Sequence, residues 1–195
     1  PEYRRKEHDR RYQSQQKTEK LDSCVRALMS RYSRTVVIRV DLHYLSIVQP
    51  LLRIEHLYAD LSSLIRSRER NPIFEHEIGY AWSIEQGKNK GFHIHCVFFF
   101  NGAKVYSDWF KSMEIGKLWI DITGGRGYFH SCNNEKATYS IQAVGTFKRA
   151  DEEACQNVIK AMRYLTKDDQ QHLRIKPAGA RTFGTGLYTG SPTGS

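Results

Sequence analysis

The chain has 195 residues, a length that suits one domain with a substantial core. Its 30 basic residues outnumber 21 acidic ones, and the formal net charge of +9 favours nucleic acid over a membrane as the partner. No apolar run approaches the roughly 20 residues that cross a bilayer, the polar first thirty residues predict no signal peptide, and four scattered cysteines fit a reducing compartment.

Hydrophobic patterns divide the first part of the chain. Residues 1–16 are strongly charged, and we expect a flexible, irregular arm there. Apolar residues then repeat at helical spacing and predict a helix over 21–31. A β-branched run predicts a strand over 35–42. A long helix is expected over 49–68, with Pro50 in its first turn.

Two strands follow that read as an antiparallel hairpin. In residues 77–85, large apolar residues alternate with small or charged ones. Residues 91–100 are almost continuously apolar, and a turn-like segment with one glycine joins the two strands. In the first strand, one face is expected to carry Ile78, Tyr80, Trp82 and Ile84, and the other Gly79, Ala81, Ser83 and Glu85.

The rest of the chain predicts shorter elements. These are a helix over 106–119, strands over 128–131 and 139–147, and a helix over 151–165. The folded domain is therefore expected over 17–176. The segment 177–195 is rich in Gly, Ser, Thr and Pro, and we expect this tail to be poorly ordered.

The apolar strand of the hairpin contains two histidines, His93 and His95. Alternate residues of a strand point to the same side, so both imidazoles face one side of the sheet. Glu85 sits opposite His93 if the turn is centred near Asn89, and its carboxylate then joins them. These three groups form a ligand set for a divalent ion, although the set alone does not choose among Mg, Mn, Zn and Fe. Without that context, the two histidines read as half-buried, hydrogen-bonded side chains.

A second motif, Tyr164-Leu165-Thr166-Lys167, closes the last predicted helix. Tyr164 lies about 140° from the centre of the apolar stripe of that helix, so it is not one of its core residues. Lys167 shares its side if the helix continues by one turn, and a cation there favours tyrosinate or holds a phosphate. The pattern is short, and Tyr3-Arg4-Arg5-Lys6 in the charged arm matches it too.

Taken in order, these features resemble the HUH endonucleases of rolling-circle replication. The chain has a strand with a carboxylate, a turn, a His-x-His strand, and then a helix bearing Tyr-x-x-Lys. Gly91-Phe92-His93-Ile94-His95, Trp82-x-x-Glu85 and Tyr164-Leu165-Thr166-Lys167-Asp168-Asp169-Gln170 look like the replication initiators of filamentous-phage (inovirus) type and their prophage relatives. A non-haem iron oxygenase would use the same three ligands, but the basic chain and the tyrosine argue against it.

The resemblance implies an α+β domain with a central antiparallel sheet flanked by helices. It implies that His93, His95 and one carboxylate bind Mg²⁺ or Mn²⁺ and that Tyr164, steadied by Lys167, is the single nucleophile. Glu85 is the expected third ligand, and the other candidate carboxylates are Glu75, Glu77 and Asp41. The expected activity is nicking and rejoining of single-stranded or hairpin origin DNA through a 5′-phosphotyrosine, in the cytoplasm of a bacterial host.

Other contacts and other functions stay open on the sequence alone. Side chains that would guide the DNA backbone are Lys88, Lys90, Lys160 and Arg163, each of which reads equally as a solvated charge. A host helicase and polymerase are expected partners of a replication initiator. The alternatives are a single-tyrosine transposase of the same fold, which would recognise hairpin ends and exchange strands, and a catalytically idle DNA-binding regulator.

Overall fold

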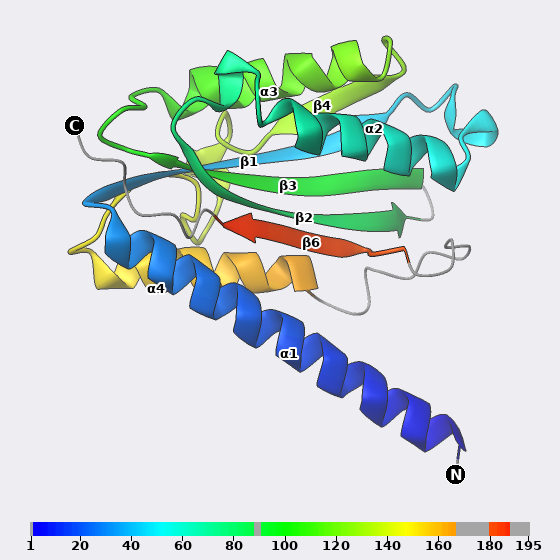
Figure 1. The fold of residues 1–195 in the computed structure, drawn as a ribbon, viewed down its shortest axis with the longest axis horizontal. Coiled ribbons are helices and arrows are strands. Elements are labelled where there is room, and N and C mark those ends of the chain that lie inside the picture. The colour runs from blue at the N-terminus through cyan, green and yellow to red at the C-terminus, as the bar shows by residue number, and fades with distance from the viewer. Residues whose placement is uncertain (1, 88–90, 167–179, 188–195) are drawn as a thin grey trace.

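Six antiparallel strands form one sheet in the computed structural model, which describes residues 2–87, 91–166 and 180–187 (Figure 1). The strand order is β4-β1-β3-β2-β6, and β5 pairs with β1 beside β4. The strands are β1 Arg34–Tyr44, β2 Glu77–Gly87, β3 Gly91–Asn101, β4 Gly127–Ser131, β5 Gly145–Lys148 and β6 Phe183–Leu187. The expected α+β fold, one domain with a central antiparallel sheet flanked by helices, is therefore confirmed.

Helices cover both faces of the sheet (Figure 1). The α-helices are α1 Glu2–Arg31, α2 Ile54–Ser67, α3 Asp108–Ile122 and α4 Glu152–Met162. Short 3₁₀ helices are η1 Gln49–Leu51, η2 Pro72–Phe74, η3 Lys136–Thr138 and η4 Arg163–Thr166. Among the described residues, no helix combines the length and the apolar character that a bilayer span requires.

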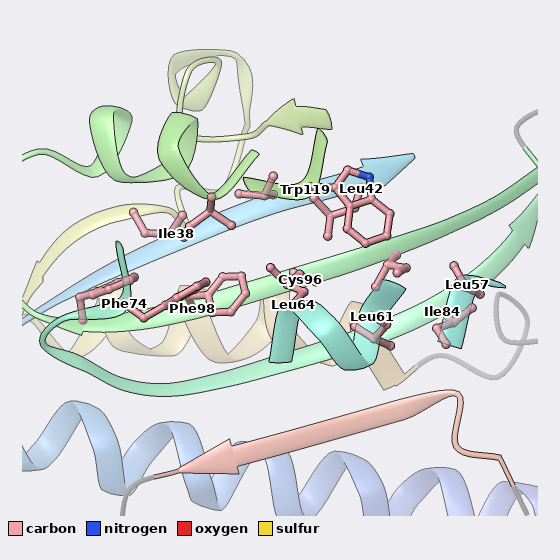
Figure 2. Close-up of a cluster of buried hydrophobic side chains, with 14 of the residues drawn as sticks. Ile38, Leu42, Leu57, Leu61, Leu64, Phe74, Ile84, Cys96, Phe98 and Trp119 are labelled. Carbon is pink, nitrogen blue, oxygen red and sulfur yellow. The ribbon is translucent and has the colours of Figure 1, made fainter. Parts of the chain in front are cut away.

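The larger core lies between the sheet and the pair α2 and α3 (Figure 2). Alternate residues of β1, including Ile38 and Leu42, meet Leu57 and Leu64 of α2 there, and all four are fully buried. Trp119 of α3 closes the core, and its indole nitrogen donates a hydrogen bond of 3.0 Å to the main-chain oxygen of His43. This core holds the strands that carry the polar residues of the opposite face.

The second core lies between the opposite face and the pair α1 and α4. It joins sheet residues such as Val37, Val97 and Phe99 to the apolar stripe of α4, which includes Val158 and Met162. The stripe predicted for this helix is confirmed. Further along the same strands, polar side chains replace the apolar ones, and the functional site is built there.

The N-terminal segment differs from its prediction. Residues 1–16 were expected to be irregular, whereas helix α1 already begins at Glu2. The segment 2–31 contains neither Pro nor Gly, and its Glu, Gln, Lys and Arg residues all favour helix. A hydrogen bond of 2.9 Å from Gln15 to Glu19, one helical turn apart, supports the polar part. An apolar repeat in a sequence indicates only the part of a helix that packs against the core, so it does not predict the polar first half of α1.

A β-bulge in β2 changes the expected assignment of faces. Glu77 pairs with Phe100 and Gly79 with Phe99, so Ile78 is an extra residue. Ile78 therefore joins the second core instead of following Tyr80. The bulge also turns Glu77 to the α2 side.

The predicted strand over 139–147 is wrong in length, because β5 covers only Gly145–Lys148. Between β4 and β5 the buried side chain of Asn133 takes the place of a strand. Its amide donates to the main-chain oxygen of Val37 at 3.0 Å and accepts from the main-chain nitrogen of Arg39 at 2.9 Å. These main-chain groups of β1 are thus hydrogen-bonded although no continuous strand of the described sheet lies beside them there.

Strand β6 lies within the tail that was expected to be poorly ordered. It pairs with β2, placing Gly184 opposite Trp82 and Gly186 opposite Tyr80. A Cβ atom at either glycine would overlap the aromatic ring opposite. The two glycines are therefore required for close packing, although a glycine-rich segment of this kind resembles a linker.

The long helix predicted over 49–68 is two elements. Its first turn is η1, and α2 begins only at Ile54, where the Arg53 main-chain nitrogen donates to Nδ1 of His56 at 3.3 Å. The helix predicted over 106–119 is α3, shifted two to three residues along the chain.

Candidate metal centre

Two rows of polar side chains cross the sheet on the α1–α4 side. The first row runs through directly paired residues of four strands, Tyr128 of β4, His43 of β1, His93 of β3 and Glu85 of β2. The second row, two residues along, contains His130, Asp41, His95 and Ser83 in the same strand order. Because paired residues share a face, the register alone gathers these side chains.

His93, His95 and Glu85 form a buried cluster whose ligand atoms all lie within 4.8 Å of one another. Oε2 of Glu85 lies 3.0 Å from Nε2 of His93 and 3.3 Å from Nε2 of His95. The predicted hairpin register is confirmed, since Glu85 pairs with His93. Three donor atoms that converge from two adjacent strands can hold a divalent cation.

A hydrogen-bond acceptor on the Nδ1 side of each imidazole, away from Glu85, fixes the orientation of the ring. Nδ1 of His93 donates to the main-chain oxygen of Gly91 at 3.1 Å, and Nδ1 of His95 donates to Oδ1 of Asp41 at 2.8 Å. Without metal, Nε2 of His93 donates to the Glu85 carboxylate. In the neutral rings that would bind a cation, the proton stays on Nδ1 and each Nε2 would offer its lone pair to an ion beside Glu85. This arrangement of an outer acceptor, an imidazole and an inner donor atom is typical of metal-binding histidines.

The electrostatics of the cluster favour a positive charge at its centre. Burial raises the pKa of Glu85, but the hydrogen bond from His93 and the close ion-pair contact with His95 outweigh burial and lower that pKa to about 2. Burial lowers the pKa of His95, whereas its hydrogen bond with Asp41 and the nearby Glu85 raise it to about 9. The Asp41 carboxyl has a lowered pKa, because its contacts with His95 and Arg39 outweigh burial.

One buried atom is unsatisfied in a way that a cation would explain. Nε2 of His95 has no hydrogen-bond partner among the described residues, because Glu85 lies 3.3 Å away without hydrogen-bond geometry. A buried polar atom without a partner is costly. A metal ion bonded to Nε2 would remove this cost, so the donor set fits a divalent ion.

The other candidate carboxylates do not join the cluster. Asp41 lies behind His95, where it also accepts a bond of 3.1 Å from Nε of Arg39. Glu77 is turned to the α2 face and forms a paired contact with Arg68 at 2.6 and 2.7 Å. Glu75 is exposed, in the turn before β2. Glu85 is the carboxylate that the fold brings to the two histidines.

Tyr164 lies beside this cluster. Helix α4 ends at Met162, so Tyr164 belongs to the 3₁₀ turn η4 and not to the α-helix expected over 151–165. Its half-buried ring stands edge-on to the His95 ring, with centroids 6.0 Å apart. The guanidinium carbon of Arg39 lies 5.6 Å from the centroid of the Tyr164 ring.

The structure places two of the expected cationic residues. Lys160 is exposed on α4. Arg163 binds Asp22 of α1 through Nη2 at 2.6 Å and Nε at 3.1 Å, which ties η4 to α1. Lys88, Lys90 and Lys167 lie outside the described residues. Contact of any of these residues with DNA stays a prediction.

Three residues of the site were missed by sequence reasoning. Arg39 and His43 alternate with Asp41 along β1, opposite the fully buried Val40 and Leu42. Three polar residues at strand spacing in an otherwise apolar strand were the available signal. Tyr128 reaches the site only through strand pairing, and no local pattern indicates it.

Comparison with known proteins assigns the chain to a family. No curated protein matches it in sequence. The family model of the YagK/YfjJ C-terminal domain matches residues 3–186, which is almost the whole chain. The chain therefore belongs to the YagK/YfjJ C-terminal domain family, which is associated with prophages.

Proposed function

We propose that this protein is a metal-dependent nickase and strand transferase for single-stranded DNA, of the HUH type, which initiates rolling-circle replication of a prophage-like element. The observation that carries the proposal is the position of Tyr164 beside a buried His–His–Glu cluster. The net charge of +9 and the prophage-associated family agree with a DNA substrate from a mobile element.

His93, His95 and Glu85 would hold Mg²⁺ or Mn²⁺. When bound, that ion supplies a Lewis acid that polarises the scissile phosphate and offsets charge on its oxygens. Asp41 and the main-chain oxygen of Gly91 keep the two imidazoles in the tautomer that presents Nε2. Arg39 is a positioning residue, because it contacts both the Asp41 carboxylate and the Tyr164 ring.

The covalent step is an in-line displacement at phosphorus. The hydroxyl oxygen of Tyr164 forms a bond to phosphorus and loses its proton, while the bond from phosphorus to the 3′ oxygen of the preceding nucleotide breaks. That oxygen takes up a proton and leaves as a free 3′-hydroxyl, and the DNA end stays on Tyr164 as a 5′-phosphotyrosine. The new ester conserves the phosphodiester bond, so a later 3′-hydroxyl can displace the tyrosine and reseal the strand.

The test is a nicking assay on labelled single-stranded DNA with Mn²⁺. Tyr164→Phe removes only the nucleophilic oxygen and should abolish nicking while metal binding remains. His93→Ala should lose metal binding and nicking together. Tyr3→Phe, in the second copy of the Tyr-x-x-Lys pattern, is the matched control and should nick like the wild type.

Each other outcome has a defined meaning. Full nicking by Tyr164→Phe would refute the assigned nucleophile. DNA binding without nicking by the wild-type protein would instead identify an idle DNA-binding relative. Strand exchange between hairpin ends, without release of a free 3′-hydroxyl, would identify a transposase.

A further inference from the structure

We propose that the outer face of the Tyr128 ring stacks on one unpaired nucleobase of the DNA strand that enters the metal centre. This inference rests on the proposed function, and it adds a base-binding position beside the phosphate-binding one. It assigns a role to the row of rings that begins at the sheet edge and ends at a metal-ligating histidine.

The row is a continuous stack of three rings. Tyr128 and His43 lie with centroids 5.0 Å apart and an interplanar angle of 16°. His43 and His93 lie 5.4 Å apart at 18°. Each contact joins directly paired residues of neighbouring strands, so the sheet register fixes the stack. The last ring, His93, belongs to the His–His–Glu cluster.

The open end of this stack is Tyr128. Strand β4 lies at the end of the strand order, so no further strand of the described sheet covers the far side of the ring. His43 covers one face of the ring, yet 44% of Tyr128 remains exposed, although His43 itself is only 7% exposed. A large aromatic ring that keeps one face in solvent and the other in a stack can take another flat ring.

The protein itself holds the stack of Tyr128, His43 and His93 in place before any ligand binds. On the opposite side of the sheet, the indole nitrogen of Trp119 donates a hydrogen bond to the main-chain oxygen of His43. Next to Tyr128, the main-chain nitrogen of Gly127 donates a hydrogen bond of 2.9 Å to the hydroxyl of Thr123. These bonds fix the strand backbone, and the stacking on the buried His43 ring orients the Tyr128 ring, so less ordering is needed when a base binds. A base is the fitting occupant because the adjacent cluster suits a phosphate-bound cation and the chain is strongly basic.

The experiment is an abasic-site scan of a single-stranded substrate, with binding measured by fluorescence anisotropy for the wild type, Tyr128→Ala and Tyr128→Phe. Removal of one particular base should weaken wild-type binding by about 5- to 150-fold, the usual range for one base stacked on an aromatic ring. Tyr128→Ala should lose a similar factor on the intact strand and be insensitive to that abasic site. Tyr128→Phe keeps the ring and should behave as the wild type.

Two controls separate the possible failures. Tyr106→Ala removes another tyrosine, 82% exposed and located beyond the opposite end of β3 from His93, and should not change binding. Thermal unfolding and Mn²⁺ titration show whether Tyr128→Ala keeps its fold and metal centre. If the wild type binds and nicks DNA but no abasic position depends on Tyr128, the stacking proposal alone is wrong. If the wild type binds no single-stranded DNA, the proposed function fails with it.

Discussion

Proton competition at His95 should make metal binding steeply dependent on pH. A protonated imidazole cannot bind a cation, and the pKa of His95 is raised to about 9 because Asp41 and Glu85 outweigh burial. With that pKa, the unprotonated fraction grows about 30-fold between pH 6.5 and pH 8, whereas an imidazole with the ordinary pKa near 6.5 gains only about twofold. The Mn²⁺ association constant should follow the larger factor.

Isothermal titration calorimetry with Mn²⁺ in buffers of different ionisation enthalpy measures both the affinity and the number of protons released. Asp41→Asn removes the carboxylate that holds the proton on His95, so the mutant should show a flatter pH profile. Asp121→Asn, at an exposed position of α3, is the matched control. A twofold change for the wild type, or an unaltered profile in Asp41→Asn, would refute the proposed coupling between Asp41 and His95.

Three further results are expected. Without metal, protonated His95 should stabilise the fold, because folding raises its pKa to about 9. This stabilisation should be complete below about pH 6.5 and should disappear as the pH rises through about 9, which urea unfolding at several pH values will measure. Gly184→Ala forces a methyl group into the Trp82 ring and should lower the free energy of unfolding by about 1–3 kcal/mol, more than Thr185→Ala in the same strand; equal losses would contradict the close packing of β6. DNA affinity should fall with a clear negative slope of log affinity against log salt, and a flat line would argue against binding driven by the +9 charge.

The central hairpin could be predicted from the sequence because its signals are local. Alternation in β2, a short turn and an apolar β3 determine which residues share a face, and these patterns alone are enough to bring Glu85 to His93 and His95. The apolar stripe of α4 is likewise predicted from the sequence, although the helix ends at Met162 and Tyr164 lies in the following turn η4. Short-range periodicity carries this information without knowledge of the remaining fold.

The rest of the site depends on contacts between distant segments. The stack of Tyr128 on His43 exists only because β4 pairs with β1, and the role of Asn133 depends on a gap between two edge strands. The bulge moves Ile78 to the face opposite Tyr80, because it inserts one extra residue in β2. Strand β6 could not be predicted because a glycine-rich segment is typical of a linker. The glycines are needed only because the rings of Trp82 and Tyr80 pack against them in the folded sheet.

The position of the covalent link is the most direct test of the proposed mechanism. The wild-type protein should be incubated with single-stranded DNA and Mn²⁺, denatured, and digested with protease and nuclease before mass spectrometry of the peptides. The mechanism predicts a nucleotide attached through its 5′ phosphate to the peptide that contains Tyr164, and no such adduct from Tyr164→Phe. A nucleotide on a different residue, or nicked DNA without any protein adduct, would contradict the claim that Tyr164 is the nucleophile.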